Sequence, residues 1–163
     1  MGAFERFIYF LNRVLLWVAT VLLGAMILLT CANIFLRVVW LPVRGTFELM
    51  GYGGAVITAF ALGYTQWKRG HIAVDILVLA FPDKIRRILN GLNSFILMVF
   101  FAMITWQIAK YATILRETGE LTETLMIIYY PFTYAVALGC AALSLVFLSE
   151  LLKFFIDQEK ETK

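Results

Sequence analysis

Few side chains in this sequence are of types that could do chemistry. The only histidine is His71, and Asp75 follows it four residues later. On a helix, residues at i and i+4 lie on the same face, so a protonated histidine could pair with this carboxylate. We expect His71 either to make this pair or to be an ordinary residue at the membrane surface.

Other kinds of catalytic or cofactor site are excluded by composition. A transmembrane b-type haem needs paired histidine ligands, which one histidine cannot supply. Cys31 and Cys140 are the only cysteines, too few with one histidine for a metal cluster. No Ser/His/Asp set and no glycine-rich phosphate loop is present. We therefore expect no enzyme activity, no cofactor and no metal.

Four apolar stretches without a charged residue account for more than half of the chain. The composition is 62% hydrophobic, with a mean hydropathy of +0.85. The shortest stretch would form about 28 Å of helix, close to the ~30 Å hydrocarbon core of a bilayer. The sequence thus predicts an all-α polytopic membrane protein, one domain over residues 1–163, with four transmembrane helices. They are Val14–Leu36, Leu49–Trp67, Gly91–Ala109 and Leu125–Ser149.

The basic residues are distributed unequally between the two sides of this arrangement. Ten of the 14 Lys and Arg residues fall in the N-terminal segment, the connection between spans two and three, and the C-terminal tail. Cytoplasmic loops are enriched in Lys and Arg, so both termini are predicted to be cytoplasmic. Because topology explains the basic residues, we do not expect nucleic-acid binding.

Small residues recur at every fourth position of the second span, at Gly51, Ala55, Ala59 and Gly63. Small side chains let helix backbones approach closely, which is the usual packing device inside membranes. The pattern predicts a tight helix contact, either within this chain or with a partner subunit.

The connection between spans two and three contains a short apolar segment, Ile72–Phe81. As a helix it would be about 15 Å long, too short to cross a bilayer. We expect a short cytoplasmic helix lying in the membrane interface or against another protein. After Pro82, apolar residues at helical spacing alternate with basic residues and predict an amphipathic helix leading into span three.

Charged residues near the ends of the spans have two interpretations each. Glu48 opens span two, where a carboxylate suits the helix dipole, but it could also pair with Arg37, Arg44 or a partner protein. The third connection carries Glu117, Glu120 and Glu123 and is either a solvated loop or a docking surface.

Polar side chains within the spans are uncharged. Pumps and ion pathways usually show an ionisable residue inside the membrane, and these spans have none. We expect the polar groups to join helices rather than bind a substrate; they are Asn33, Thr58, Asn93, Ser94 and Gln107. The residues alone therefore predict a subunit that scaffolds a larger membrane machine.

The stretch Gly70-His71-Ile72-Ala73-Val74-Asp75 after an apolar span resembles the small membrane subunit of tripartite ATP-independent periplasmic (TRAP) transporters, the DctQ family. That family also shows an Arg near the end of span one, an acidic residue opening span two and a Pro near the start of span four. Arg37, Glu48 and Pro131 hold these positions. Many members have two adjacent acidic residues where this chain has Glu48 alone.

This resemblance implies a specific role. Such transporters sit in the bacterial or archaeal inner membrane and import organic acids, such as dicarboxylates, sialic acids or sulfonates, on a Na⁺ gradient. A large permease subunit carries the transport sites, and an extracytoplasmic substrate-binding protein delivers the substrate. The small subunit is a fixed scaffold in contact with lipid and the large subunit. Arg44, Glu117, Glu120 and Glu123 are candidates for contact with the binding protein.

Two other functions are compatible with the residues. The chain could anchor or assemble another complex, such as a respiratory enzyme. It could also form a channel or exporter by homo-oligomerisation, in which case the chain alone would transport.

Overall fold

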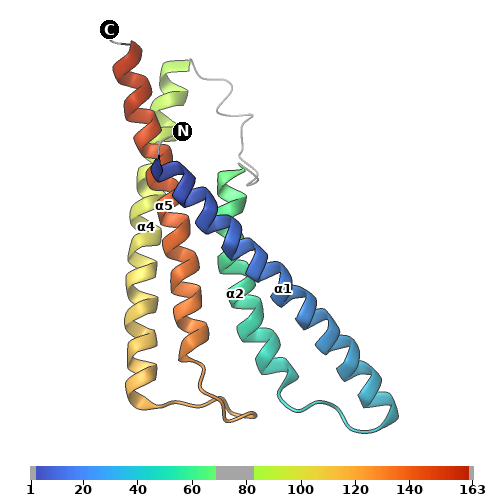
Figure 1. The fold of residues 1–163 in the computed structure, drawn as a ribbon. Coiled ribbons are helices and arrows are strands. Elements are labelled where there is room, and N and C mark those ends of the chain that lie inside the picture. Colours follow the sequence, from blue (N-terminus) through green and yellow to red (C-terminus); the bar gives the residue numbers. More distant parts are fainter. Residues whose placement is uncertain (1–2, 69–82, 162–163) are drawn as a thin grey trace.

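The protein is all-helical over the residues that the computed structural model describes, 3–68 and 83–161. The helices are α1 (Ala3–Val39), α2 (Thr46–Trp67), α4 (Asp83–Thr118) and α5 (Tyr130–Glu161) (Figure 1). The described residues contain no strand, although Leu121 and Ile128 form an isolated antiparallel bridge. The all-helical fold expected from the sequence is confirmed.

The helices form a fan rather than a closed bundle. α4 packs along α5, α5 packs against α2, and α2 packs against α1. Figure 1 shows α1 running obliquely to α4 and α5 and moving away from them toward its C-terminal end. The α1–α2 and α4–α5 connections lie at one end of the molecule, here called the loop end. Both chain termini lie at the opposite end, here called the terminal end (Figure 1).

The core lies where α1, α2 and α5 meet. On α1 the buried residues are Ile8, Asn12, Leu15 and Ala19, a spacing of three and four that places them on one helix face. This face packs against α2 and α5 in a cluster; its buried members are Leu15, Ala19, Val56, Phe60 and Ala142. Beyond Ala19 every residue of α1 is half-buried or exposed.

The closest approach between α2 and α5 is at Ala59 and Gly139. A Cβ atom added to Gly139 would lie 2.7 Å from the carbonyl carbon and oxygen of Ala59. Only a residue without a side chain permits this backbone contact, as in other close helix crossings of membrane proteins.

Three described helices are long and apolar enough to cross a membrane, in the segments Phe4–Val39, Leu89–Thr118 and Tyr130–Phe154. α2 is not among them. With 22 residues it is about 33 Å long, sufficient for a bilayer. α2 packs between α1 and α5, and it exposes less of its surface than α1 does. Four spans remain a prediction.

Two boundaries differ from the sequence prediction or extend it. α5 begins at Tyr130, five residues after the predicted start of span four at Leu125, because residues 121–128 form a structured loop. Pro131 is the second residue of α5, where its fixed φ and missing N–H fit the first helical turn. α4 is one continuous helix from Asp83, so the segment expected to lead into span three joins it directly. The predicted interfacial helix Ile72–Phe81 lies outside the described residues.

Candidate functional site

At the loop end, Glu48 joins α2 to the α4–α5 connection. Its carboxylate accepts hydrogen bonds from the backbone N–H of Thr124 (2.6 Å) and of Leu125 (3.1 Å). No ion pair links Glu48 to Arg37 or Arg44 in the part of the chain that the structure describes. Glu48 does lie in the first turn of α2, where a carboxylate suits the helix dipole. Its contact with the α4–α5 connection is not among the roles expected from the sequence.

The residues just before Glu48 make this contact sterically possible. Gly45 adopts φ +73° just before α2, and a Cβ atom there would collide with the Leu125 side chain. A glycine is thus required both for the left-handed turn and for the space that Leu125 fills. Partial burial of Glu48 opposes its ionisation, but the hydrogen bonds from Thr124 and Leu125 outweigh this effect and lower its pKa.

The α4–α5 connection is ordered by its own contacts. Thr122 donates its backbone N–H to Ile127 (2.9 Å), and the Thr122 hydroxyl accepts the N–H of Ile127 (3.2 Å). The Tyr129 hydroxyl donates to the Glu120 carboxylate (2.6 Å), and the Tyr129 ring stacks on Tyr52 of α2 at 5.4 Å. Glu48 therefore holds a preformed loop against the end of α2.

At the terminal end, a second carboxylate joins three helices. Glu150 of α5 accepts hydrogen bonds from the Gln66 side-chain amide of α2 (3.1 and 3.2 Å) and from the Ser94 hydroxyl of α4 (3.3 Å). α2 and α4 share no extensive contact, so Glu150 links two helices that otherwise meet only through α5.

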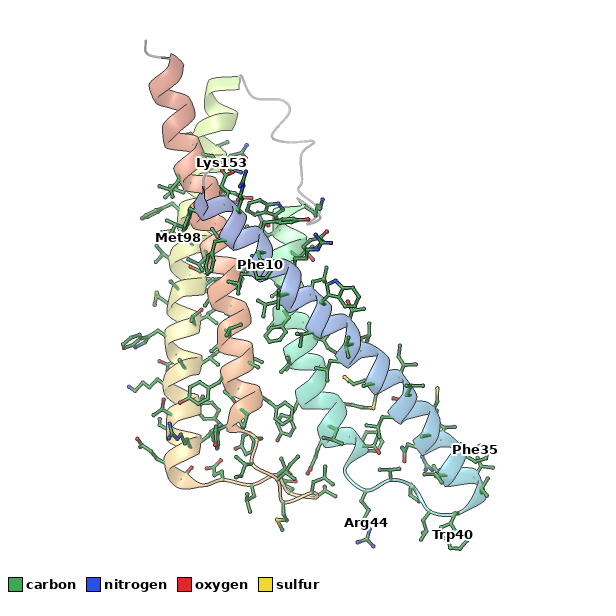
Figure 2. All side chains as sticks on the ribbon, in the orientation of Figure 1. Phe10, Phe35, Trp40, Arg44, Met98 and Lys153 are labelled. Carbon is green, nitrogen blue, oxygen red and sulfur yellow. The ribbon has the colours of Figure 1, made fainter. Side chains whose placement is uncertain are left out.

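Next to Glu150, the Lys153 side chain reaches α1 and α2. Its ammonium lies 3.3 Å from the Glu5 carboxylate and 5.1 Å from the centre of the Trp67 ring, which in turn packs on Tyr9 at 6.0 Å. Figure 2 shows Lys153 above the N-terminal part of α1. Side chains from all four described helices thus meet at the terminal end.

The small-residue series of α2 divides into two halves. Ala59 and Gly63 are buried, Gly63 beneath the Asn12 amide of α1, whereas Gly51 and Ala55 are exposed. A four-residue step advances 40° beyond a full turn on a 3.6-residue helix, so the series winds around α2. The buried residues of α2 instead follow spacings of three, four and seven; they are Thr46, Gly53, Val56, Ala59, Phe60 and Gly63.

The remaining predicted site residues are not gathered into one site. Arg37 and Arg44 are exposed at the loop end, and Pro131 is exposed at the start of α5. Glu117 is exposed in the last turn of α4, and Glu120 and Glu123 are exposed in the α4–α5 connection. Gly70, His71 and Asp75 lie outside the described residues. Across the described ranges, no group of His, Cys, Asp or Glu is arranged to hold a metal ion.

Sequence reasoning missed the Glu150 site because the fourth span was taken to end at Ser149. Helix α5 continues to Glu161, and Glu150 lies within its apolar segment Tyr130–Phe154. Of the polar groups expected to join helices, Ser94 does so through Glu150. Asn33 instead accepts the backbone N–H of Val43 (2.8 Å), which ties α1 to the α1–α2 connection. The signal for these pairs is a polar residue near the end of each span, but the partners are far apart in sequence.

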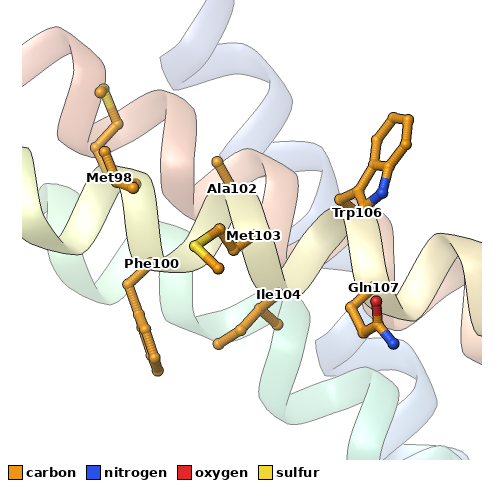
Figure 3. Close-up of a pocket in the computed structure, with 8 residues that line it drawn as sticks. Met98, Phe100, Ala102, Met103, Ile104, Trp106 and Gln107 are labelled. Carbon is orange, nitrogen blue, oxygen red and sulfur yellow. The ribbon is translucent and has the colours of Figure 1, made fainter.

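The exposed side of α4 is an apolar surface. Figure 3 shows the side chains along it, and all eight that line a hollow of about 660 Å³ belong to this helix. The hollow is therefore open along the helix flank and is not an enclosed binding cavity. Its lining is Met98, Val99, Phe100, Ala102, Met103, Ile104, Trp106 and Gln107.

Comparison with known proteins assigns the chain to a family. The chain matched no curated protein and no solved structure. The sequence model of the family described as "Tripartite ATP-independent periplasmic transporters, DctQ component" matches residues 26–156, which include α2, α4 and the greater part of α5. The chain therefore belongs to the DctQ family, the small permease component of TRAP transporters.

Proposed function

We propose that this chain is the scaffold subunit in Na⁺-coupled uptake of an organic acid. Its partners are a large permease subunit and an extracytoplasmic substrate-binding protein. The observation that carries the proposal is the match to the DctQ component over residues 26–156. The substrate belongs to the organic acids that such transporters take, such as dicarboxylates, sialic acids or sulfonates.

In this proposal the chain crosses the inner membrane four times, with both termini in the cytoplasm. The shared position of the termini supports an even number of crossings (Figure 1). The excess of basic residues in the N-terminal segment, the connection between α2 and α4 and the C-terminal tail supports their cytoplasmic location. The terminal end is then cytoplasmic and the loop end extracytoplasmic.

The charged residues of the described helices support a structural rather than a transporting role. Glu48 and Glu150 lie near opposite ends of the bundle, and each is held by hydrogen bonds from neighbouring elements. A transport pathway usually shows an ionisable group within the membrane that faces a cavity. The substrate and ion sites accordingly belong to the large subunit.

The exposed flanks of the fan provide surfaces for partners. We propose that the large subunit contacts mainly apolar and small side chains, including Gly51 and Ala55, whose side of α2 is open in this chain. The acidic residues at the end of α4 and in the α4–α5 connection are the proposed contact with the binding protein; they are Glu117, Glu120 and Glu123.

Reconstitution tests this function directly. Liposomes holding this chain alone should take up nothing, because it carries no transport site. Liposomes with both membrane subunits, the binding protein and an inward Na⁺ gradient should accumulate an organic acid. Uptake by the chain alone, or full uptake in its absence, would contradict the scaffold role.

A further inference from the structure

The connection between α1 and α2 exposes large apolar side chains at the loop end. Val38, Trp40 and Phe47 are 82%, 80% and 85% exposed, and Leu41 is 68% exposed. Figure 2 shows Trp40 and Arg44 projecting from the end of the molecule, away from the helices. Residues 38–47, here called the apolar connection, thus have apolar surface that the fold itself does not cover.

Helix α1 is longer than the membrane is thick, and its exposed apolar side chains extend to this connection. From Val14 to Val39 the helix is about 39 Å long, which exceeds the ~30 Å hydrocarbon core. A span longer than the membrane is accommodated by tilt, and α1 is inclined to α4 and α5 (Figure 1). The exposed apolar side chains of α1 reach the apolar connection through Phe35, Val38 and Val39, with Arg37 exposed among them.

The apolar connection and the α4–α5 connection lie at the same end of the molecule but differ in the sign of their exposed charges. Arg37 and Arg44 are exposed beside the apolar side chains, and the nearest carboxylate, Glu48, is bonded to the α4–α5 connection. The last turn of α4 and the α4–α5 connection instead expose three carboxylates, Glu117, Glu120 and Glu123, with Arg116 beside the first of them. Arginine with Trp and other apolar side chains suits the phosphate and acyl boundary of a bilayer, and a run of carboxylates does not.

We propose that the apolar connection lies in the headgroup region of the leaflet at the loop end and anchors α1 in its tilted position. Its occupant is phospholipid, with Trp40 and Phe47 at the acyl boundary and Arg37 and Arg44 at the phosphates. The proposal places Arg44 on lipid and leaves the acidic loop for the binding protein. It does not depend on which substrate is transported.

The test is the membrane depth of Trp40. In a full-length chain with Trp17, Trp67 and Trp106 changed to Phe, Trp40 is the only tryptophan. In vesicles of phosphatidylcholine and phosphatidylglycerol, lipids with a quencher near the headgroup should quench it about twofold more than lipids labelled near the acyl terminus. Aqueous iodide should quench it weakly. A matched chain in which all four tryptophans are changed to Phe and the only tryptophan comes from Ile27→Trp, an exposed position near the middle of Val14–Leu36, should show the opposite depth preference.

Two results would overturn the proposal. One is strong quenching of Trp40 by iodide with no response to labelled lipids, which would place the connection in water. The other is protection from both quenchers only after the large subunit or binding protein is added, which would identify a protein contact. Replacing Arg37 and Arg44 with Gln should weaken headgroup quenching in vesicles rich in phosphatidylglycerol, and an unchanged response would also contradict the arginine–phosphate contact.

Discussion

The two ends of the molecule use a glutamate in different ways. At the loop end, Glu48 binds two backbone N–H groups of one loop. At the terminal end, Glu150 binds two side chains, Gln66 and Ser94, that come from two different helices. Both carboxylates connect elements that are distant in the sequence.

Because Glu48 binds backbone groups and Glu150 binds side chains, the two contacts differ in how far they depend on particular residues. Backbone N–H groups are present at every residue except proline, so the Glu48 contact depends on the loop's shape more than on its side chains. The Glu150 contact needs a donor side chain at two particular positions on separate helices. We therefore expect the terminal-end contact to be lost by single substitutions at any of three residues, and the loop-end contact to depend on Glu48 and on the turn at Gly45.

Between the two ends, α2 and α5 are held together where Gly139 contacts Ala59. The substitution Gly139→Ala should therefore have the largest effect on stability. The new Cβ would lie 2.7 Å from the Ala59 backbone, which cannot move aside as a side chain can. We expect a loss of about 1–3 kcal/mol in the free energy of unfolding, as for other overpacked sites. The midpoint of thermal unfolding in mild detergent measures it.

Gly51→Ala is the matched control for this substitution. No atom lies within 4 Å of the Cβ position at Gly51, and the change should stabilise α2 slightly because alanine favours a helix. Equal stability of the Gly139→Ala and Gly51→Ala variants would show that the crossing does not hold the helices together.

Glu150→Ala should have the next largest effect. It leaves the Gln66 amide and the Ser94 hydroxyl without their acceptor, at a cost of about 1 kcal/mol for hydrogen bonds between membrane helices. The same unfolding assay on Glu150→Ala, Gln66→Ala and the double variant gives their coupling energy. Additive effects would show that these two side chains do not stabilise the fold together.

Acidification should loosen the loop end selectively. Hydrogen bonds to ionised Glu48 lower its pKa below the ordinary value of 4.5, so they stabilise the fold above that pH. This stabilisation is lost as the pH falls through the lowered pKa. Hydrogen exchange of residues 119–129, corrected for the intrinsic effect of pH, should accelerate in acid.

Glu48→Gln provides the control for the effect of pH. A glutamine does not titrate, so in this variant the exchange of the loop should already be faster at neutral pH and should respond less to acid. An identical acid response in both proteins would assign the change to other carboxylates.

Lys153→Met should produce the smallest change. Its ion pair with Glu5 is half exposed, and such pairs contribute about 0–1 kcal/mol and weaken with salt. The methionine retains contact with the Trp67 ring but removes the charge. Stability measured at low and high salt should differ less in the variant than in the parent chain. A loss larger than that of Glu150→Ala would show that Lys153, and not Glu150, contributes most to the stability of the terminal end.

Most of the fold could be predicted from the sequence because its signals are local. Uncharged apolar runs predicted the helices. The start of span four was placed at Leu125 because residues 125–129 are apolar, yet those residues form the end of a loop. Their backbone groups pair with Glu48 and Thr122, and hydropathy does not register such contacts.

The site was less predictable. Glu48 stood out because it is a lone carboxylate at the start of an apolar helix, but its partners are 76 and 77 residues away. In the small-residue series of α2, Ala59 and Gly63 are buried against neighbouring helices. Its other half is exposed, because a four-residue repeat does not follow one face of a 3.6-residue helix over several turns.

The sequence by itself determined that this chain is helical and apolar, and it carried the resemblance to the DctQ component, because these properties depend on residue type and spacing along the chain. Only the tertiary structure decided that the helices form an open fan, that Gly139 meets Ala59, and that Glu150 joins α2 and α4 to α5. Helix packing depends on the rotation and crossing of each helix relative to its neighbours. Apolar side chains of similar hydropathy permit many such arrangements, and the few glycines and polar pairs select one of them.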